Sequence, residues 1–377
     1  MIWFLIFILS CYVILIVSLT IGFKNVKDFK AKNLEPKTKF SVVVPFRNEA
    51  KNLPNLLNSI NLLNYPKELF EFIFIDDDSE DHSVEIIQQV LDSISPKSEI
   101  TRTNFKVLKN YRKSNSPKKD AITTAISKAK HNWIITTDAD CILPKNWLNA
   151  FDHFIQKNNP KMIVAPVNYK LENTFLAQFQ LLDFMSMQGT TIGGFGINFP
   201  FLCNGANLGY KKANFINLNG FEGNNTMASG DDIFLFEKFV EVGKKNVQYL
   251  KSSEAIVDTF PVKTWKDLIH QRTRWAAKTS NFNSINVKLI GLVVLLTNLF
   301  VIVYLFTGSL KTIYIPFGLK LIVDWFLLKP TLQFFNHKMN FVKWYVPASL
   351  LYPFFSIYII FKSIFFKYNW KGRSFKK

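Results

Sequence analysis

The sequence predicts an α/β domain with a mostly parallel sheet, flanked by apolar segments that can cross a membrane. Three observations carry this prediction. Residues 38–285 alternate short apolar runs with stretches of helical periodicity, the pattern of repeated βα units. Residues 1–23 contain no charged side chain, and the chain after residue 287 is again predominantly apolar. We therefore expect the middle of the chain to fold in water and both ends to lie in a bilayer.

The first apolar segment predicts an N-terminal transmembrane helix over residues 1–23, because a bilayer core needs about 20 apolar helical residues. It lacks the basic n-region, the shorter apolar core and the small-residue cleavage site of a signal peptide, so we expect a retained anchor. Four lysines and a single acid follow closely: Lys24, Lys27, Lys30 and Lys32, with Asp28. By the positive-inside rule, the chain after the anchor is expected in the cytoplasm.

The middle of the chain predicts one domain over residues 38–280. Five apolar runs predict strands, at residues 39–45, 70–75, 105–109, 133–137 and 161–167. Helical spacing of apolar residues predicts helices at residues 52–63, 84–91 and 119–130, with another after Pro144. Strands and helices that alternate in this way favour a parallel sheet covered by helices.

The C-terminal part predicts a membrane region over residues 287–366. Two segments in it are long enough to span a bilayer, residues 287–307 and 342–362. Residues 312–330 leave two alternatives open, because this segment contains Pro316 and because Lys320 and Asp324 stand one turn apart, where they can pair. If it crosses, the basic tail lies outside. If it lies in the interface, the tail is cytoplasmic, as the positive-inside rule favours. We expect three or four passes.

Charge and cysteine content narrow the range of partners and of cysteine sites that can be expected. The net charge is +18, and much of it lies beside the apolar segments, including five Lys and Arg residues in 367–377. Basic residues in such places suit anionic lipid headgroups, so no nucleic-acid partner is expected. Cys11, Cys141 and Cys203 have no metal-site spacing and are expected to be reduced structural thiols.

Polar clusters follow three of the predicted strands. They are Arg47-Asn48-Glu49, Asp76-Asp77-Asp78-Ser79 and Asp138-Ala139-Asp140. In open α/β sheets, ligands bind outside the carboxyl ends of the strands. We therefore expect these three clusters to converge at one edge of the sheet and to form a binding site there.

The pair Asp138 and Asp140 predicts a divalent metal site. Mg²⁺ and Mn²⁺ prefer carboxylate oxygens and often share their coordination shell with substrate phosphates. A bound cation would also remove the repulsion between the two carboxylates. The alternative is a pair of solvated loop acids that cap the following helix.

Two further segments allow more than one interpretation. Residues 76–87 are not a calcium loop, because Asp81 and Ile87 occupy the positions that need Gly and Glu. A carboxylate in this segment can recognise a nucleotide, or Ser79 or Asp81 can open the next helix. Lys118 and Lys119 stand at a predicted helix start, where lysine suits a phosphate but also suits a solvated surface.

The order of motifs along the chain resembles that of the family 2 inverting glycosyltransferases. The motifs are VVVPFRNE (42–49), FIDDDS (74–79), KKDAITTAI (118–126), TTDADC (136–141), NGANLGY (204–210), GDDIFLFEKF (230–239) and QRTRW (271–275). The chain looks most like the membrane-embedded branch that includes cellulose, hyaluronan and poly-N-acetylglucosamine synthases. The resemblance covers about residues 38–280.

The resemblance implies a GT-A fold, with a Rossmann-like nucleotide-binding half and an acceptor-binding half. The donor is expected to be a nucleotide sugar, most often UDP-linked, and the cofactor a divalent cation, Mg²⁺ or Mn²⁺. The donor-site residues it implies are Pro45 and Glu49 in the nucleotide pocket, Asp76 or Asp77 at the uridine, Lys119 near the nucleotide, Asp138 near ribose and metal, and Asp140 as the direct metal ligand.

The resemblance also implies a base and an acceptor site. Asp232, beside Asp231, matches the acid that takes the proton of the acceptor hydroxyl, although acids at a helix start also favour the helix itself. Gln271, Arg274 and Trp275 match the QxxRW motif, in which Arg274 can clamp pyrophosphate and Trp275 can face a sugar ring. Their segment also has the spacing of an interfacial amphipathic helix.

Some features depart from the synthases of that branch. The acid motif is Gly-Asp-Asp rather than Thr-Glu-Asp, so the product cannot be inferred. So few spans do not predict a polysaccharide channel in one chain, which leaves partner membrane subunits open. The glycines of Gly193-Gly194-Phe195-Gly196 predict a mobile loop at the acceptor site or a plain turn.

The sequence thus predicts a multi-pass enzyme of the cell (inner) membrane with a cytoplasmic catalytic domain. It is expected to move a sugar to a lipid-linked or glycan acceptor by metal-assisted single displacement. Processive synthesis is the alternative within the family. A non-catalytic nucleotide- or lipid-binding scaffold is the alternative from another class.

Overall fold

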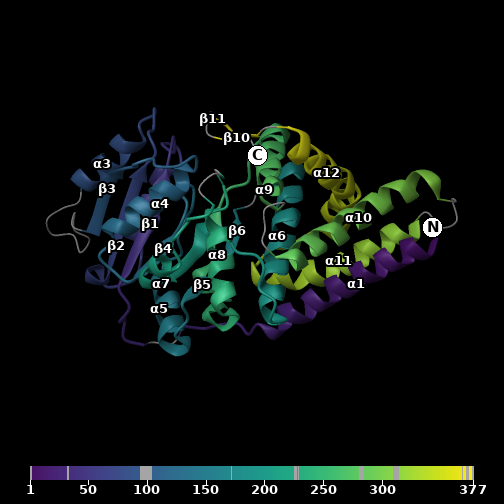
Figure 1. Ribbon diagram of the computed structural model, residues 1–377, viewed down its shortest axis with the longest axis horizontal. Coiled ribbons are helices and arrows are strands. Elements are labelled where there is room, and N and C mark those ends of the chain that lie inside the picture. Colours follow the sequence, from purple (N-terminus) through teal and green to yellow (C-terminus); the bar gives the residue numbers. More distant parts are fainter. Residues whose placement is uncertain are drawn as a thin grey trace. The chain divides into compact units, whose positions relative to one another are not determined.

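The computed structural model describes residues 2–31, 34–93, 104–170, 172–224, 227, 229–279, 284–308, 314–366, 368–370 and 373–375 (Figure 1). The chain forms two compact units, and each is discontinuous in sequence. The sheet unit comprises Lys27–Asn168 and Leu202–Phe260. The helical unit comprises Met1–Val26, Tyr169–Phe201 and Pro261–Lys377.

The sheet unit is built on a seven-stranded sheet with the strand order β3-β2-β1-β4-β7-β5-β8. The strands are β1 (Phe40–Phe46), β2 (Phe70–Asp76), β3 (Phe105–Lys109), β4 (Trp133–Thr136), β5 (Met162–Val164), β7 (Leu208–Lys211) and β8 (Val247–Tyr249). Strands β3, β2, β1 and β4 are parallel, β5 is parallel to β8, and β7 runs antiparallel to both of its neighbours. A separate pair joins β6 (Val167–Tyr169) and β9 (Val257–Thr259).

Helices of the sheet unit alternate with its strands from β1 to β5, and α7 and α8 follow β7 (Figure 1). They are α2 (Leu53–Asn61), α3 (Ser83–Ser93), α4 (Pro117–Lys128), α5 (Trp147–Asn158), α7 (Lys212–Asn217) and α8 (Asp231–Val242). Short 3₁₀ turns lie at Lys67–Leu69, Gly205–Asn207, Lys244–Asn246 and Ser253–Ala255. Every residue of β1 except Pro45 is buried, and so is every residue of β2 except Asp76. Burial on both faces explains why these strands are continuous apolar runs in the sequence.

The predicted mostly parallel α/β sheet is confirmed, and its first four strands lie within one residue of their predicted ends. The prediction of one strand over residues 161–167 is wrong. That segment contains β5 and the start of β6, which belong to different sheets. Pro166 stands between them and has no backbone N–H to continue a ladder. Strand β7, only four residues long, was not predicted.

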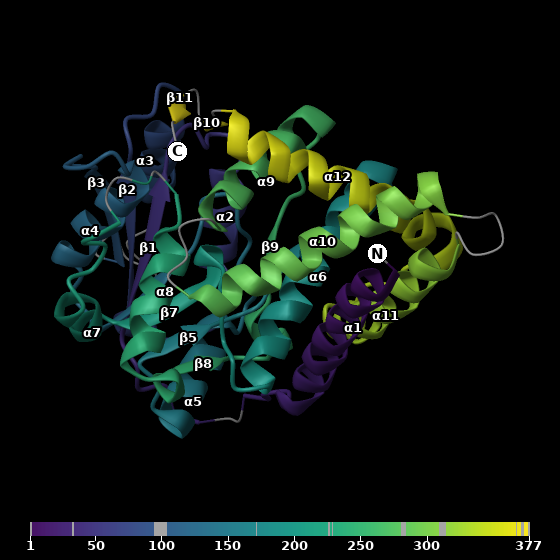
Figure 2. The same cartoon turned by 45° about the vertical axis from the view of Figure 1, so that its right-hand side comes forward.

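The helical unit contains six α-helices among the described residues (Figure 2). They are α1 (Ile2–Asn25), α6 (Phe175–Gly196), α9 (Trp265–Thr279), α10 (Ile285–Thr307), α11 (Tyr314–Phe334) and α12 (Val346–Phe365). A π-helical turn at Phe341–Tyr345 leads into α12, and β10 (Tyr368–Trp370) pairs antiparallel with β11 (Arg373–Phe375). Helix α1 packs against α6, α10 and α11, and α12 packs against α9 and α10.

Three described segments are long and apolar enough to cross a membrane: Trp3–Asn25, Ile285–Thr307 and Phe341–Phe365. They coincide closely with the three segments for which the sequence predicts spans. Helix α11 is not among them, and it carries the Lys320–Asp324 pair, whose Nζ and Oδ2 atoms are 2.5 Å apart. These two side chains thus form the pair that their spacing allows. Asp324 also accepts a hydrogen bond of 2.5 Å from the hydroxyl of Tyr12 in α1.

The glycines at residues 193–196 lie in the last turn of α6, so the prediction of a loop or turn is wrong. They allow α6 to approach α1 closely. A Cβ added to Gly196 would lie 1.8 Å from the carbonyl oxygen of Gly22, and one added to Gly193 would lie 2.4 Å from that of Leu19. Small residues are what permit two helix backbones to come this near.

Candidate functional site in the sheet unit

The carboxyl ends of β2, β1 and β4 lie side by side, because these strands are neighbours and run parallel. Asp76 ends β2, and Asp138 and Asp140 stand two and four residues after the end of β4. The structure thus brings the polar clusters that follow these strands to one edge of the sheet, as the sequence predicts.

Lys118, in the first turn of α4, connects two parts of this edge. Its Nζ lies 2.8 Å from Oδ1 of Asp138 and 3.3 Å from Oδ2 of Asp231, the first residue of α8. Burial alone would lower the pKa of Lys118, but the carboxylates of Asp138 and Asp231 outweigh it, so the pKa is raised and the ammonium stays charged. One cation therefore joins the acid after β4 to the acid pair at the start of α8.

The segment 204–207 supports the acid pair from another side. The backbone N–H of Gly205 donates to Oδ2 of Asp232 at 3.2 Å, and its carbonyl accepts from the hydroxyl of Thr136 at 2.9 Å. A Cβ on Gly205 would lie 3.2 Å from Cβ of Asp232 and 3.4 Å from Oδ2 of Asp231. Gly205 thus lets the backbone come close to both acids, and it fixes Asp232 relative to β4.

Asn207, in the same segment, is fully buried and holds the turn in place. Its Oδ1 accepts from Nε1 of Trp147 at 3.0 Å, and its Nδ2 donates to the carbonyls of Pro166 and Ala255, both at 2.8 Å. The motif NGANLGY drew attention to this stretch, but neither the Gly205 nor the Asn207 contact was assigned from sequence.

Lys119 points elsewhere. It is 1% exposed, and its Nζ donates to the carbonyls of Asn224 and Met227 at 2.6 and 3.0 Å. The ammonium also lies 5.0 Å from the ring centroid of Phe234 in α8. Successive residues of a helix are about 100° apart, so only one of the two lysines can face the acids. That residue is Lys118, and a contact between Lys119 and a nucleotide stays a prediction.

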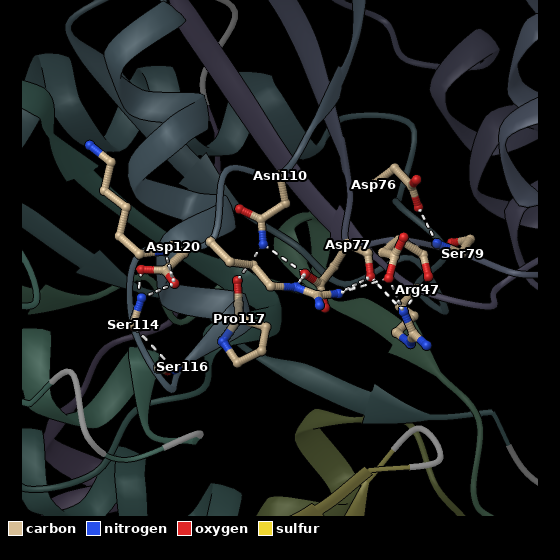
Figure 3. Close-up of polar contacts among 12 residues, drawn as sticks. Arg47, Asp76, Asp77, Ser79, Asn110, Ser114, Ser116, Pro117 and Asp120 are labelled. Carbon is tan, nitrogen blue, oxygen red and sulfur yellow. Dashed lines mark hydrogen bonds and ion pairs between the residues drawn. The ribbon is translucent and has the colours of Figure 1, made fainter.

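Asp77 lies at the centre of a second polar group at the end of β2 (Figure 3). It is 5% exposed, and its Oδ1 accepts from Nδ2 of Asn110 and Nε of Arg112, both at 2.7 Å. Arg47 donates from Nη1 to the carbonyl of Asp77 at 2.8 Å and also to that of Asp78. The hydrogen bond to Asp77 raises the pKa of Arg112. This carboxylate is therefore already engaged by two neighbouring side chains.

The other predicted nucleotide residues are partly exposed at the same strand ends. Pro45 and Asp76 are half-buried, and Oδ1 of Asp76 accepts from the N–H of Ser79 at 2.9 Å. Glu49 accepts from Nδ2 of Asn52 at 2.6 Å. The carboxylates of Asp76 and Glu49 suit hydrogen bonds with a base or ribose, whereas the side chain of Pro45 offers only an apolar contact. Contact of all three residues with a nucleotide stays a prediction.

Asp81 has the helix-opening role that the sequence offered as an alternative. Its Oδ1 accepts from the N–H of Ser83, the first residue of α3, and its Oδ2 accepts from the N–H of Ala50, both at 3.0 Å. Burial opposes the ionised form, but the hydrogen bonds from Ser83 and Ala50 lower the pKa of Asp81. This carboxylate therefore ties the start of α3 to the segment after β1.

Among the described residues, no group of three or more His, Cys, Asp or Glu side chains is arranged to hold a metal ion. Asp138 and Asp140 thus offer two carboxylates, and any further ligands would have to come from elsewhere. Beside them, burial raises the pKa of the Cys141 thiol, and the carboxylates of Asp140 and Asp138 raise it further. A neutral, buried thiol agrees with the structural role expected for this cysteine.

The residues of the QxxRW motif belong to the helical unit, where Gln271, Arg274 and Trp275 lie on α9 and are half-buried. Arg272, for which the sequence predicted only a place on an interfacial amphipathic helix, is buried between them. Its guanidinium donates to Gln271 and lies 4.2 Å from the ring centroid of Trp275. These contacts became visible only with the structure.

Residues 133–360 match the family described as Glycosyl transferase family group 2, and residues 41–215 match the one described as Glycosyl transferase family 2. The poly(ribitol-phosphate) beta-N-acetylglucosaminyltransferase TarS of Staphylococcus aureus is 28% identical over 126 residues, which are 33% of this chain and 20% of that protein. An uncharacterized glycosyltransferase of Mycoplasma genitalium is 30% identical over 141 residues, 37% of this chain and 44% of that one. The chain thus spans less than half the length of these relatives.

Among solved structures, the mannosyltransferase PcManGT from Pyrobaculum calidifontis, in complex with GDP-Man and Mn²⁺, has a similar fold. Its TM-score is 0.51 at 13% sequence identity, and the match covers 95% of this chain and 99% of that one. At this identity the likeness concerns the fold alone. The predicted GT-A-like arrangement, with a mostly parallel sheet, is confirmed at this level.

Proposed function

The chain belongs to the Glycosyl transferase family group 2, and we propose that it moves a sugar from a nucleotide-sugar donor to a lipid-linked or glycan acceptor, with inversion, while anchored in a membrane. The observation that supports this most is the contact of Lys118 with both Asp138 and Asp231. It joins the acids proposed for the donor side to the acid pair proposed for the base.

The donor is proposed to lie at the carboxyl edge of β2, β1 and β4. Pro45, Glu49, Asp76 and Asp77 are the proposed nucleotide contacts. Two similar proteins support a nucleotide sugar as donor: TarS is named as a beta-N-acetylglucosaminyltransferase, and PcManGT was solved with GDP-Man. We propose a nucleoside diphosphate sugar, UDP-linked by the family resemblance.

We assign the lysine beside the diphosphate to Lys118 rather than to Lys119, whose ammonium is occupied by two backbone carbonyls. A charged ammonium held by carboxylates can turn one of its N–H groups toward a phosphate oxygen that approaches. This would hold the leaving group and stabilise the negative charge that develops on it.

The carboxylates of Asp138 and Asp140 fit Mg²⁺ or Mn²⁺, because both ions prefer oxygen ligands and the edge carries more carboxylates than cations. The remaining ligands would come from the donor diphosphate and from water. When bound, the ion neutralises charge on the diphosphate. The Mn²⁺ in the PcManGT complex supports this choice of cofactor.

Asp232 is the proposed base, with Asp231 beside it. The N–H of Gly205 holds Oδ2 of Asp232, and the N–H of Ile233 donates to Oδ1 at 2.8 Å. Both hydrogen bonds orient the carboxylate at the start of α8. In single displacement the oxygen of the acceptor hydroxyl would attack the anomeric carbon, and the hydroxyl would give its proton to this carboxylate.

The membrane arrangement proposed here places the sheet unit in the cytoplasm and the apolar helices in the cell membrane. The three span-length helices and the lysines that follow α1 support it. Gln271, Arg274 and Trp275 are the proposed contacts for the acceptor and the pyrophosphate. An acceptor held at a bilayer surface is the kind that lipid-linked or growing glycans provide.

The proposal is tested by incubating membranes that contain the chain with a panel of radiolabelled donors: UDP-glucose, UDP-galactose, UDP-N-acetylglucosamine and GDP-mannose. One donor is expected to label membrane lipid or glycan, and EDTA should abolish labelling until Mn²⁺ is restored. Asp140→Asn should lower the rate by at least about 100-fold, since it removes a metal ligand. Asp92→Asn, an exposed carboxylate on α3, is the matched control and should leave the rate unchanged.

Processive synthesis is favoured by one feature, the QRTRW segment in α9. The length of the products decides between the two modes. A processive enzyme gives long products while most acceptor remains unused, and single addition labels many acceptors by one sugar. Full activity of Asp140→Asn without metal would contradict the proposed site in either mode.

A further inference from the structure

Arg272 and Asp183 form a buried ion pair inside the helical unit. Nε of Arg272, in α9, lies 2.5 Å from Oδ2 of Asp183, in α6. Arg272 is 5% exposed and Asp183 is 8% exposed. Burial opposes the charge on Arg272, but the Asp183 carboxylate raises its pKa, so the guanidinium is charged. The pair therefore fixes the guanidinium at one point between α9 and α6.

The same guanidinium contacts two residues that the proposed function places at the acceptor. Its Nη1 donates to Oε1 of Gln271, and its Cζ lies 4.2 Å from the ring centroid of Trp275. Gln271 and Trp275 are only half-buried. One buried side chain thus sets the orientation of two side chains that remain open to a ligand.

Aromatic packing constrains Trp275 further. The ring of Phe184, in α6, lies 6.4 Å from the Trp275 ring, and Phe184 is itself stacked on Tyr169 at 4.3 Å. Phe184 is the residue after Asp183, so α6 supplies both the anchor for Arg272 and a contact for the indole. The indole is therefore held by neighbours on α6 as well as by the guanidinium.

Lysine could not make this set of contacts. A guanidinium donates from several nitrogens in one plane and offers that plane to an aromatic ring, whereas an ammonium is a compact point charge. Arg272 uses Nε for Asp183, Nη1 for Gln271 and its plane for Trp275.

We propose that Arg272, held by Asp183, is a positioning residue that orients Gln271 and Trp275 for the acceptor. The inference rests on the proposed transferase function, because that function gives Gln271 and Trp275 their role. It goes beyond that function by assigning a task to two buried residues to which the proposed function gives no contact with donor or acceptor.

The first test separates the acceptor from the donor. With the donor found by the panel, the rate of transfer to membrane acceptor is compared with the rate of donor hydrolysis, in which water replaces the acceptor. Arg272→Lys should lower transfer at least about tenfold, while hydrolysis stays near the wild-type rate, because water needs no oriented indole. Asp183→Asn should shift the ratio of transfer to hydrolysis in the same direction.

The second test needs no substrate. Acrylamide quenching of tryptophan fluorescence is measured in the presence and absence of the Trp275→Phe substitution, so that the difference reports Trp275 alone. In Arg272→Lys, the Trp275 contribution should become more quenchable, because the guanidinium no longer covers the ring. If Arg272→Lys fails to fold, the same comparison is made in Asp183→Asn.

A matched control distinguishes positioning from general support of α6. Gln180 is also buried on α6 and exchanges two hydrogen bonds with the backbone of Val262, at 2.9 and 3.0 Å. Gln180→Met should lower the melting temperature without changing the ratio of transfer to hydrolysis or the quenching of Trp275.

The outcomes are distinct. A lower ratio and a more accessible Trp275 in the Arg272 and Asp183 variants, but not in Gln180→Met, support the inference. An unchanged ratio together with unchanged quenching in folded Arg272→Lys overturns it, and so does an equal loss of transfer and hydrolysis. If the wild type neither transfers nor hydrolyses any donor, the proposed function fails. The positioning inference then fails with it, even if quenching shows that Arg272 shields Trp275.

Discussion

The sheet unit and the helical unit each contain a lysine paired with acidic side chains, and the two clusters differ in the number of carboxylates that the lysine contacts and in their exposure. In the sheet unit, Lys118 lies 2.8 Å from Asp138 and 3.3 Å from Asp231, and the Asp138 side chain is 36% exposed. One ammonium there faces two carboxylates, and Asp140 and Asp232 follow them in the chain by two residues and by one. The cluster keeps negative charge close to solvent, where a cation can reach it.

In the helical unit, Lys320 faces one carboxylate, that of Asp324, at 2.5 Å. The Tyr12 hydroxyl supplies a further donor to Asp324, and the Lys320 side chain is only 7% exposed. Both members of the pair lie on α11, and the hydrogen bond from Tyr12 connects it to α1. The two clusters thus differ in exposure and in the number of carboxylates around the lysine, and these two features led us to propose the first cluster, and not the second, as part of a binding site.

The largest effect is expected when the Lys320–Asp324 pair is broken. Asp324→Asn leaves the buried ammonium of Lys320 without its counter-charge, and should lower the free energy of unfolding by about 3–5 kcal/mol. Replacing both partners, with Lys320→Met and Asp324→Leu together, should restore most of this loss, because no buried charge remains. Denaturant unfolding in detergent measures both. A single variant as stable as the wild type would show that the pair is not structural.

The next largest effect is expected on the rate of sugar transfer, when Lys118 of the sheet unit is replaced. Lys118→Met should lower the rate of sugar transfer about 100-fold, since the charge at the leaving group is lost. The adjacent Lys119→Met is the matched control. It leaves two buried carbonyls without a donor and should cost about 1–3 kcal/mol of stability, with the rate per folded molecule retained. The opposite pattern, with activity lost only in Lys119→Met, would return the nucleotide role to Lys119.

A smaller effect is expected where α6 packs against α1 in the helical unit. Gly196→Ala places a Cβ against the backbone of α1 and should destabilise the helical unit by about 1–3 kcal/mol. Gly291→Ala, in α10, is the control, because a Cβ there meets no described atom within 4 Å. Thermal unfolding of the two variants should differ, and equal melting temperatures would contradict the close approach of α6 and α1.

The smallest effect is a pH dependence within the sheet unit. Burial opposes the ionised form of Glu71, but hydrogen bonds from Lys106, Ser41 and the backbone of Lys130 lower its pKa overall. A depressed pKa in the folded state adds stability above the unfolded pKa, and this stability disappears as the pH falls through the folded value. The wild type should therefore lose stability below about pH 4.3 more steeply than Glu71→Gln. The melting temperature of each protein is measured from pH 6 to pH 3. An equal fall in melting temperature for the two proteins would contradict this assignment.

Much of the sheet unit could be predicted from sequence. The first four strands are buried apolar runs, and the acids stand where parallel strands end, so periodicity and position were sufficient. Strand β7 escaped prediction because it is only four residues long, contains Gly209 and is held by antiparallel neighbours distant in sequence. Such short strands depend on tertiary pairing more than on local pattern.

The candidate site was predictable in its residue types but not in its contacts. Lys118 and Lys119 are indistinguishable by pattern, and only the phase of α4 shows which one faces the acids. Arg272 and Asp183 are 89 residues apart, so nothing local connects them. The glycines at the end of α6 resemble a loop in the sequence. Their role is to allow the close approach of α1, and that contact is not visible in the local sequence.

We propose that the acid pair at the start of α8 acts with the strand-end acids in sugar transfer. The most direct measurement compares wild type with Asp232→Asn for two quantities, the initial rate of transfer from the labelled donor and the affinity for that donor by equilibrium dialysis. We predict that the rate falls by at least about 100-fold while the donor affinity changes little, because a base acts on the acceptor proton and not on donor binding. Transfer at the wild-type rate by Asp232→Asn would show that Asp232 is not the base.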